Sequence, residues 1–275
     1  MGNIFIEIFK KITILNSILM IIYCFFHPDL GEFEFMFIIM ILLLISCCFF
    51  ALVSCEIDNY DGPDASIHGS IIDEVTGELV GTDIENGSSI IVREHGFTNP
   101  ADQYWSIMNT GEYRNNMVFA ATYDVRFENC NFYPFEIKDF VINDGDNFYD
   151  FKVTPYLRIK NPDIVKNGNV ITATFFLETG KPEVKVKEVQ LFAFSDKWVG
   201  NNVKYSLNGG SDKITISPSE TVVSSKKYTL TIDLEKNTNV FKYSKNYYFR
   251  IGALADVSGV GTVRHNYAPL VVIKL

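Results

Sequence analysis

The 275-residue sequence lacks the short motifs that mark common enzyme classes. It contains no H-E-x-x-H metal motif, no G-x-S-x-G nucleophile turn and no glycine-rich phosphate loop. Its five cysteines form no C-x-x-C pair, which excludes a standard zinc ribbon and a thioredoxin-type redox motif. Its histidines are few, and none follows another at the four-residue spacing of a helical metal site. We therefore expect a protein that is not an enzyme and that has no metal site and no cofactor.

Basic residues are also too few for a nucleic-acid partner. The chain has 24 Lys and Arg against 33 Asp and Glu, which gives a formal net charge of -9. A nucleic-acid-binding protein needs a basic face, so this partner class is excluded. Hydrophobic residues make up 47% of the chain, which is enough to build packed cores in one or two domains.

The first 54 residues carry two apolar stretches. Residues 12–26 follow Lys10 and Lys11, and residues 36–53 contain no charged residue. The length of the second stretch is at the lower limit for a membrane-spanning helix and at the upper limit for the apolar region of a signal peptide. It ends in Leu52-Val53-Ser54-Cys55, which resembles the lipobox of bacterial lipoproteins, where the cysteine is lipidated. We expect residues 1–54 to be a leader with a lipoprotein signal peptide, and Cys55 to become the lipidated first residue.

An alternative is a membrane hairpin made of residues 4–26 and 36–53, which leaves the lipobox as a coincidence. The basic residues lie far upstream of Met36, so a start at Met36 or Met40 also stays open. Residues 55–65 are acidic and contain Gly62-Pro63, so we expect a tether between the lipid and the first domain. A lipid anchor of this kind holds a protein at a membrane surface without crossing it.

From residue 66 onward, short runs rich in Val, Ile, Phe, Tyr and Thr recur at about ten-residue spacing, separated by turns. This pattern predicts an all-β chain with two antiparallel β-sandwich domains. The boundary falls near Thr154-Pro155, because proline interrupts a strand ladder, which gives domains 66–154 and 155–275. The expected strands are 66–72, 89–94, 123–128, 135–142 and 148–153, then 156–160, 170–177, 184–194, 213–217, 228–234, 247–255 and 269–274.

The first domain contains Gly69-Ser70-Ile71-Ile72-Asp73, Thr76-Gly77-Glu78, and Val118 to Val125 with Tyr123. These segments resemble the carboxypeptidase regulatory-like, transthyretin-related sandwich. Asn109-Thr110-Gly111 stands where that fold usually has Asp-Gly, and Ala121-Thr122 replaces the usual Gly before the Tyr. The seven short strands of the second domain are typical of an immunoglobulin-like or fibronectin-type sandwich. In such a sandwich, Tyr247 or Tyr248 resembles the residue of a tyrosine corner.

Residues 55–275 as a whole resemble a family of two-domain bacterial lipoproteins known as a domain of unknown function. The resemblance rests on Cys55 to Ala65, Glu94-His95-Gly96, Arg114-Asn115, Val153 to Leu157 and Asn266-Tyr267-Ala268-Pro269. It implies a lipid-anchored outer-membrane protein, exposed at the cell surface, that is encoded beside starch-utilisation-type glycan uptake systems. It supplies no catalytic residues.

Aromatic residues are the best candidates for a binding site, because flat rings stack on the apolar faces of sugars. Tyr104 and Trp105 are expected in the polar loop after residues 99–103, and Trp198 is flanked by Lys197 and Gly200. We expect these three residues to contact a glycan, with core packing of Trp105 and Trp198 as the alternative. Cys130, the one cysteine after Cys55, is expected to be a small buried hydrophobe.

The sequence thus supports two main hypotheses. In the first, a surface-anchored accessory protein binds glycan within a polysaccharide uptake complex, with the membrane, a glycan and outer-membrane uptake proteins as partners. In the second, the sandwiches form a structural or adhesive surface module without glycan binding. A hydrolase would need two carboxylates across one sugar bond, and this sequence has many scattered carboxylates but no motif that pairs them.

Overall fold

The computed structural model describes residues 61–209 and 211–275, together with the single residues 18, 40 and 41. All of its strands lie in one compact unit, Asp61–Leu275. Cys55 and, apart from residues 18, 40 and 41, the apolar stretches of the leader lie outside the described residues. Among the residues that the structure does describe, no helix has the length and apolarity that a membrane span requires.

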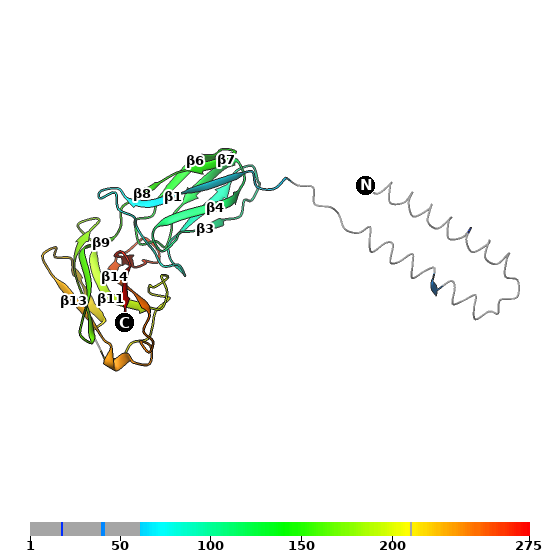
Figure 1. Ribbon diagram of the computed structural model, residues 1–275. Helices are drawn as coiled ribbons and strands as arrows, with labels where there is room; N and C mark the ends of the chain where they lie inside the picture. The colour runs from blue at the N-terminus through cyan, green and yellow to red at the C-terminus, as the bar shows by residue number, and fades with distance from the viewer. Residues whose placement is uncertain (1–17, 19–39, 42–60, 210) are drawn as a thin grey trace, which may run out of the picture. The chain divides into compact units, whose positions relative to one another are not determined.

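The first sandwich is built from two four-stranded sheets (Figure 1). In one sheet β1 pairs antiparallel with β4 and parallel with β7 and β8. In the other sheet β2, β3, β5 and β6 pair antiparallel. The strands are β1 (Ala65–Asp73), β2 (Ser89–Glu94), β3 (Gln103–Ser106), β4 (Glu112–Val118), β5 (Ala121–Arg126), β6 (Glu136–Ile142), β7 (Gly145–Phe148) and β8 (Phe151–Val153).

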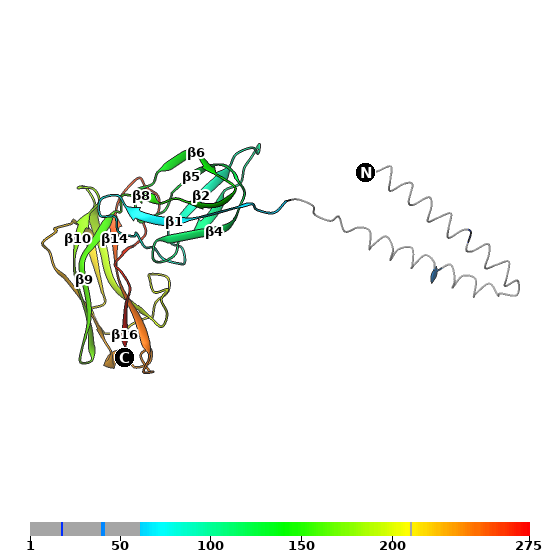
Figure 2. The ribbon, with the colours of Figure 1, turned by 45° about the horizontal axis from the view of Figure 1, so that its top comes forward.

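The second sandwich is antiparallel throughout (Figures 1 and 2). One sheet has the order β13-β10-β9, and the other has the order β12-β11-β14-β15 with β16 also on β14. The elements are β9 (Leu157–Asn167), β10 (Val170–Thr179), β11 (Lys185–Phe194), β12 (Lys213–Thr221), β13 (Tyr228–Asp233), the short 3-10 helix η1 (Glu235–Asn237), β14 (Asn246–Asp256), β15 (Asn266–Tyr267) and β16 (Val271–Lys274). The prediction of an all-β chain with two sandwiches is confirmed, with the parallel pairing of β1 as a local departure.

Each sandwich has its own hydrophobic core. In β1 every second residue is buried, so that Ile67 and Ile71 face the opposing sheet. In β10 the same alternation buries Ile171, Phe175 and Leu177. Each such side chain contributes roughly 1.5–3 kcal/mol when it leaves water. The burial of every second residue in these strands explains why apolar residues recur as they do in the corresponding parts of the sequence.

Two individual expectations are confirmed within these cores. Cys130 is 1% exposed in the first core, where burial raises the pKa of its thiol to about 12. The Tyr247 side chain is fully buried, and its hydroxyl donates to the carbonyl of Tyr243 four residues upstream at 3.1 Å. This is the arrangement of a tyrosine corner.

Arg250 of β14 joins the second sandwich to the first. Its buried guanidinium donates to the carbonyl oxygens of Thr82 at 3.1 Å and Asn109 at 2.7 Å in the first sandwich. It also donates to the Ala268 carbonyl at 3.2 Å, and its Cζ lies 4.1 Å from the centroid of the Tyr267 ring. Burial lowers the pKa of Arg250 to about 10. The cation is therefore held by neutral carbonyls and an aromatic face.

Other polar groups surround this guanidinium and complete what we call the seam. The Tyr267 hydroxyl donates to Asp83 Oδ2 at 2.6 Å, and the Asn201 amide donates to Asp83 Oδ1 at 2.8 Å. Asn131 Nδ2 donates to the carbonyl oxygens of Gly81 at 2.8 Å and His265 at 3.0 Å. A Cβ at position 81 would collide with the Arg250 guanidinium and the Asn109 carbonyl, which explains the glycine there.

An ion pair also joins the two sandwiches beside these hydrogen bonds. Arg158 of β9 forms a two-pronged contact with Asp73 of β1, in which Nη2 lies 2.8 Å from Oδ1. Burial alone would raise the pKa of Asp73, but the hydrogen bonds from Arg158 and from the Val75 amide outweigh it and lower this pKa. Both charges are thus already neutralised by each other.

Glu188, a partly buried acid, lies within the second sandwich. His265 Nε2 is 3.5 Å from Glu188 Oε1, which is an ion-pair distance rather than a hydrogen bond, and Lys213 Nζ is 2.7 Å from Glu188 Oε2. His265 and then Lys213 hold the pKa of Glu188 at about 2, although burial opposes them. The ionised form of Glu188 is therefore the form that the fold stabilises.

We predict that Arg250→Met lowers the free energy of unfolding by about 2–4 kcal/mol, because three buried carbonyls lose their hydrogen-bond donor. The desolvation cost of the buried cation also disappears in the variant, and this offsets part of the loss. Chemical denaturation measures this change. Lys227→Met, which removes the same charge from an exposed position, is the matched control and should stay within about 0.5 kcal/mol of wild type. Equal stability of the two variants would contradict the role of Arg250.

We predict that Glu188 makes stability pH-dependent at acidic pH. Its folded-state pKa of about 2 lies below the ordinary value of 4.5, so its contribution is complete above pH 4.5 and disappears as the pH falls through 2. Wild type should exceed Glu188→Gln by about 2 kcal/mol or more near neutral pH, and the two should converge toward about pH 2. Urea unfolding across this range tests the prediction, and a constant difference would refute it.

Candidate functional site

Tyr104 and Trp105 lie in strand β3, not in a loop, and this separates their roles. Successive side chains of a strand point to opposite faces. Trp105 is 4% exposed, and its ring packs edge-on against Tyr123 with centroids 6.2 Å apart. The expectation that Trp105 contacts a glycan is therefore corrected, because its ring is part of the first core. Tyr104 is 66% exposed, so its ring is available to a ligand.

Tyr104 borders a polar hollow of about 350 Å³. Such a volume falls within the range of about 300–1,000 Å³ that is typical of ligand sites. The strand pairing places Ile91 of β2 beside Tyr104 on the floor of this hollow. The remaining lining is mostly polar and comprises Asp83, Ile84, Asn86, Gly87, Ser88, Ser89, Ser106, Ile107, Glu128, Asn129 and Arg264.

Both sandwiches build this hollow, because Arg264 comes from the second one. The Arg264 amide donates to the Cys130 carbonyl at 3.0 Å, and its Nε donates to the Asn129 carbonyl at 3.3 Å. Asn129 has a positive φ of 53°, and its Oδ1 accepts from the Thr262 amide at 2.8 Å. The guanidinium of Arg264 is thereby held at the rim of the hollow that contains Tyr104.

The chemistry of the hollow suits binding. A flat ring, a carboxylate and a guanidinium together offer an apolar platform with planar hydrogen-bonding groups beside it. Of the two carboxylates in the lining, Asp83 is engaged at both oxygens within the seam. Glu128 Oε1 accepts from Arg126 Nε at 2.9 Å and is exposed. A glycosidase requires two carboxyl groups that flank one glycosidic bond, and the lining residues do not offer two free carboxylates.

Trp198 is partly buried, and one face of its ring is covered. The Nζ of Lys197 lies 4.7 Å from the centroid of the Trp198 ring. Trp198 does not line the hollow at Tyr104. The structure thus places the three predicted aromatic residues at three different kinds of position, and it leaves Tyr104 as the one with an open ring beside a hollow.

A larger opening, which we call the seam cleft, has a volume of about 810 Å³. Residues of both sandwiches line it, including Asp73, Glu78, Arg158, Lys160, Lys197 and Arg250. Apolar positions also contribute, among them Leu79, Ile159 and Leu270. No sequence motif indicates this cleft, since its residues come from distant parts of the chain.

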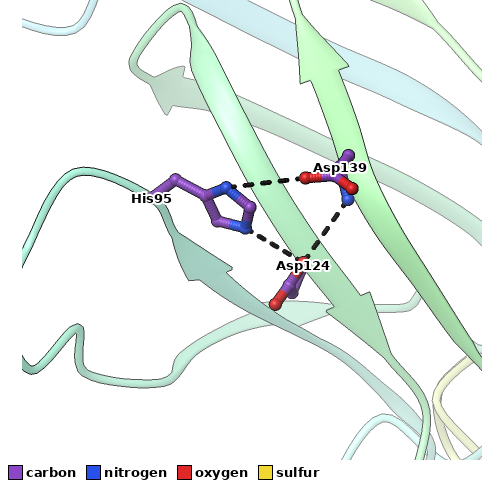
Figure 3. Close-up of side chains that lie close together, drawn as sticks. All are labelled: His95, Asp124 and Asp139. Carbon is purple, nitrogen blue, oxygen red and sulfur yellow. Dashed lines mark hydrogen bonds and ion pairs between the residues drawn. The ribbon is translucent and has the colours of Figure 1, made fainter.

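His95, Asp124 and Asp139 form an exposed group on the outer face of the first sandwich (Figure 3). His95 Nε2 lies 3.0 Å from Asp124 Oδ1, while Nδ1 lies 3.8 Å from Asp139 Oδ1. One ligand atom of each residue lies within 4.8 Å of the other two, but each ring nitrogen already faces its own carboxylate. Lys138 also contacts Asp124 and is the main cause that holds the pKa of Asp124 near 2. We interpret the group as a surface ion-pair network.

The fold and the hollow define a class of two-domain β-sandwich proteins. Residues 65–154 match the model of the N-terminal domain of a protein of unknown function, DUF3823, and residues 157–271 match the domain of unknown function DUF3823_C. The chain belongs to the DUF3823 family. The predicted resemblance to a two-domain family of unknown function is thereby confirmed.

Solved structures support the assignment. A proposed carbohydrate-binding protein from Bacteroides uniformis is 75% identical, with a TM-score of 0.76, and the alignment covers 78% of this chain and 100% of that one. Two DUF3823 proteins are more distant and show the fold alone. The one from Bacteroides ovatus has 20% identity, a TM-score of 0.58 and coverage of 76% and 98%. The one from Parabacteroides merdae has 17% identity, a TM-score of 0.61 and coverage of 78% and 100%. None of the curated proteins matches the chain.

Proposed function

We propose that this protein binds carbohydrate at the hollow beside Tyr104, without catalysis, as an accessory component of a polysaccharide uptake system. The exposed ring of Tyr104 next to a polar hollow carries the proposal. A pyranose presents C–H groups on its faces and hydroxyls around its edge. Tyr104 would contact such a face, while Glu128 and Arg264 would bond the hydroxyls. The 75% identical protein proposed to bind carbohydrate supports the same class of ligand.

We further propose that Cys55 carries the lipid that holds the protein at the outer membrane, facing the cell surface. The lipobox-like Leu52-Val53-Ser54-Cys55 supports this anchor, and the acidic residues that follow it would form the tether. Diacyl anchoring is stable, whereas one chain binds only marginally. A sugar-binding protein held in this way would raise the local glycan concentration beside outer-membrane uptake proteins.

We predict that Tyr104→Ala weakens binding to the retained glycan at least about tenfold, since stacking and desolvation at an aromatic anchor contribute about 1–3 kcal/mol. A glycan array followed by isothermal calorimetry on the whole protein provides the measurement. Tyr104→Phe should bind nearly as well, because it keeps the ring. Tyr243→Ala removes a ring that is 63% exposed in the second sandwich and is the matched control. Failure of the wild type to bind any polysaccharide would leave the structural or adhesive hypothesis.

We predict that the wild-type protein partitions into detergent and carries a diacylglyceryl mass on Cys55, whereas Cys55→Ser lacks this mass and is not cleaved at position 55. Intact-mass spectrometry of membrane extracts distinguishes the two. Protease treatment of intact cells then tests surface exposure. An unprocessed, unmodified wild-type chain would contradict the anchor and favour the membrane hairpin of residues 4–26 and 36–53.

A further inference from the structure

The seam cleft is a second opening, separate in its lining from the hollow at Tyr104. Its volume of about 810 Å³ is near the upper part of the range for ligand sites. Leu79, Ile159 and Leu270 give it apolar surface, and Leu79 is half exposed. The cleft therefore has room and surface for a ligand larger than one that fills the hollow.

The net charge of the cleft lining is positive, whereas the net charge of the chain is negative. Its lining contains the bases Arg158, Lys160, Lys197 and Arg250 and the acids Asp73 and Glu78, while the chain as a whole has a net charge of -9. Arg158 and Asp73 neutralise each other. The lining then has three further cations and one further acid, Glu78, which leaves a net of two positive charges.

The two lysines are free to meet a ligand. Within residues 61–209 and 211–275, neither Lys160 nor Lys197 has a carboxylate at ion-pair distance. Lys197 lies over the face of Trp198, from which an ammonium can move toward an anion without breaking an ion pair. Lys160 extends from β9, one strand residue beyond Ile159 in the same lining.

Arg250 adds a desolvated charge at the cleft. A guanidinium has five N–H groups, and three of those of Arg250 donate to carbonyls. In the described part of the chain no carboxylate pairs with it directly, and Asp83 is held one step away by the Tyr267 hydroxyl. A buried cation without a direct counter-ion favours an anion in the adjacent space.

We propose that the seam cleft binds an acidic sugar, a hexuronic acid residue within a glycan, whose carboxylate lies between Lys160 and Lys197. The proposal rests on the proposed function, since it takes the ligand to be a carbohydrate. The apolar lining accommodates the C–H groups of the sugar, and the cations recognise its carboxylate. The hollow at Tyr104 has mixed charges and would take a neutral part of the glycan.

Calorimetry with oligogalacturonate, oligomeric alginate and glucuronoxylan oligomers tests the proposal on the whole protein. We expect at least one of them to bind, with an affinity that falls in high salt. The same oligomer with its carboxylates methyl-esterified should bind the wild-type protein at least about tenfold more weakly. The unmodified oligomer should bind the double variant Lys160→Gln, Lys197→Gln at least about tenfold more weakly than it binds the wild type. Glu78→Gln should bind the acid about two- to fivefold more tightly, because an exposed repulsive charge is removed.

Three variants separate this inference from the proposed function. Lys227→Gln, an exposed lysine outside the cleft, should leave acid binding unchanged. Tyr104→Ala should weaken a neutral glycan while the double lysine variant leaves it unchanged. If neutral glycans bind through Tyr104 but no uronate binds, or if the ester binds as well as the acid, the cleft proposal is wrong and the proposed function stands. If no glycan of either charge binds, both are wrong.

Discussion

The buried guanidinium of Arg250 is the interaction on which the architecture of residues 61–275 depends. Among the described residues this cation has no direct counter-ion, and backbone carbonyls of Thr82 and Asn109 from one sandwich and of Ala268 from the other hold it. Backbone carbonyls are fixed in space, so this contact specifies how the sandwiches meet more narrowly than apolar contact would. The glycine at position 81 is required for the same reason, since a side chain there would occupy the place of the guanidinium.

Both openings follow from that contact. The hollow needs Tyr104 from the first sandwich and Arg264 from the second, and the cleft likewise takes Glu78 from one and Lys160 from the other. Sites between rigid layers are held more accurately than sites on single loops. The seam thus brings an aromatic ring, cations and acids from separate segments into fixed positions, as the proposed binding function requires.

The sequence predicted the fold well wherever burial alternates. The strand at 170–177 lies within β10, because its buried residues recur at every second position. The strand at 89–94 also agrees with β2, which the continuous run of β-branched residues Ile90, Ile91 and Val92 indicates. Strand β3 was missed, since Gln103-Tyr104-Trp105-Ser106 is short and only Trp105 is buried. That miss explains why Tyr104 and Trp105 were grouped as one surface pair. The rest of the two openings could not be predicted, because tertiary packing alone brings Glu128 and Arg264 to the hollow. The same holds for Lys160 and Arg250 in the cleft, and none of these residues belongs to a local motif.

The proposed function requires that the hollow beside Tyr104 receives a glycan between the two sandwiches. Hydroxyl-radical footprinting of the whole protein, with and without the glycan that it retains on an array, tests this claim most directly. We expect protection of Tyr104 and Arg264, which line the hollow, and unchanged reactivity of Tyr243, which is exposed to a similar extent. Protection confined to other surfaces, or no glycan retained at all, would contradict it.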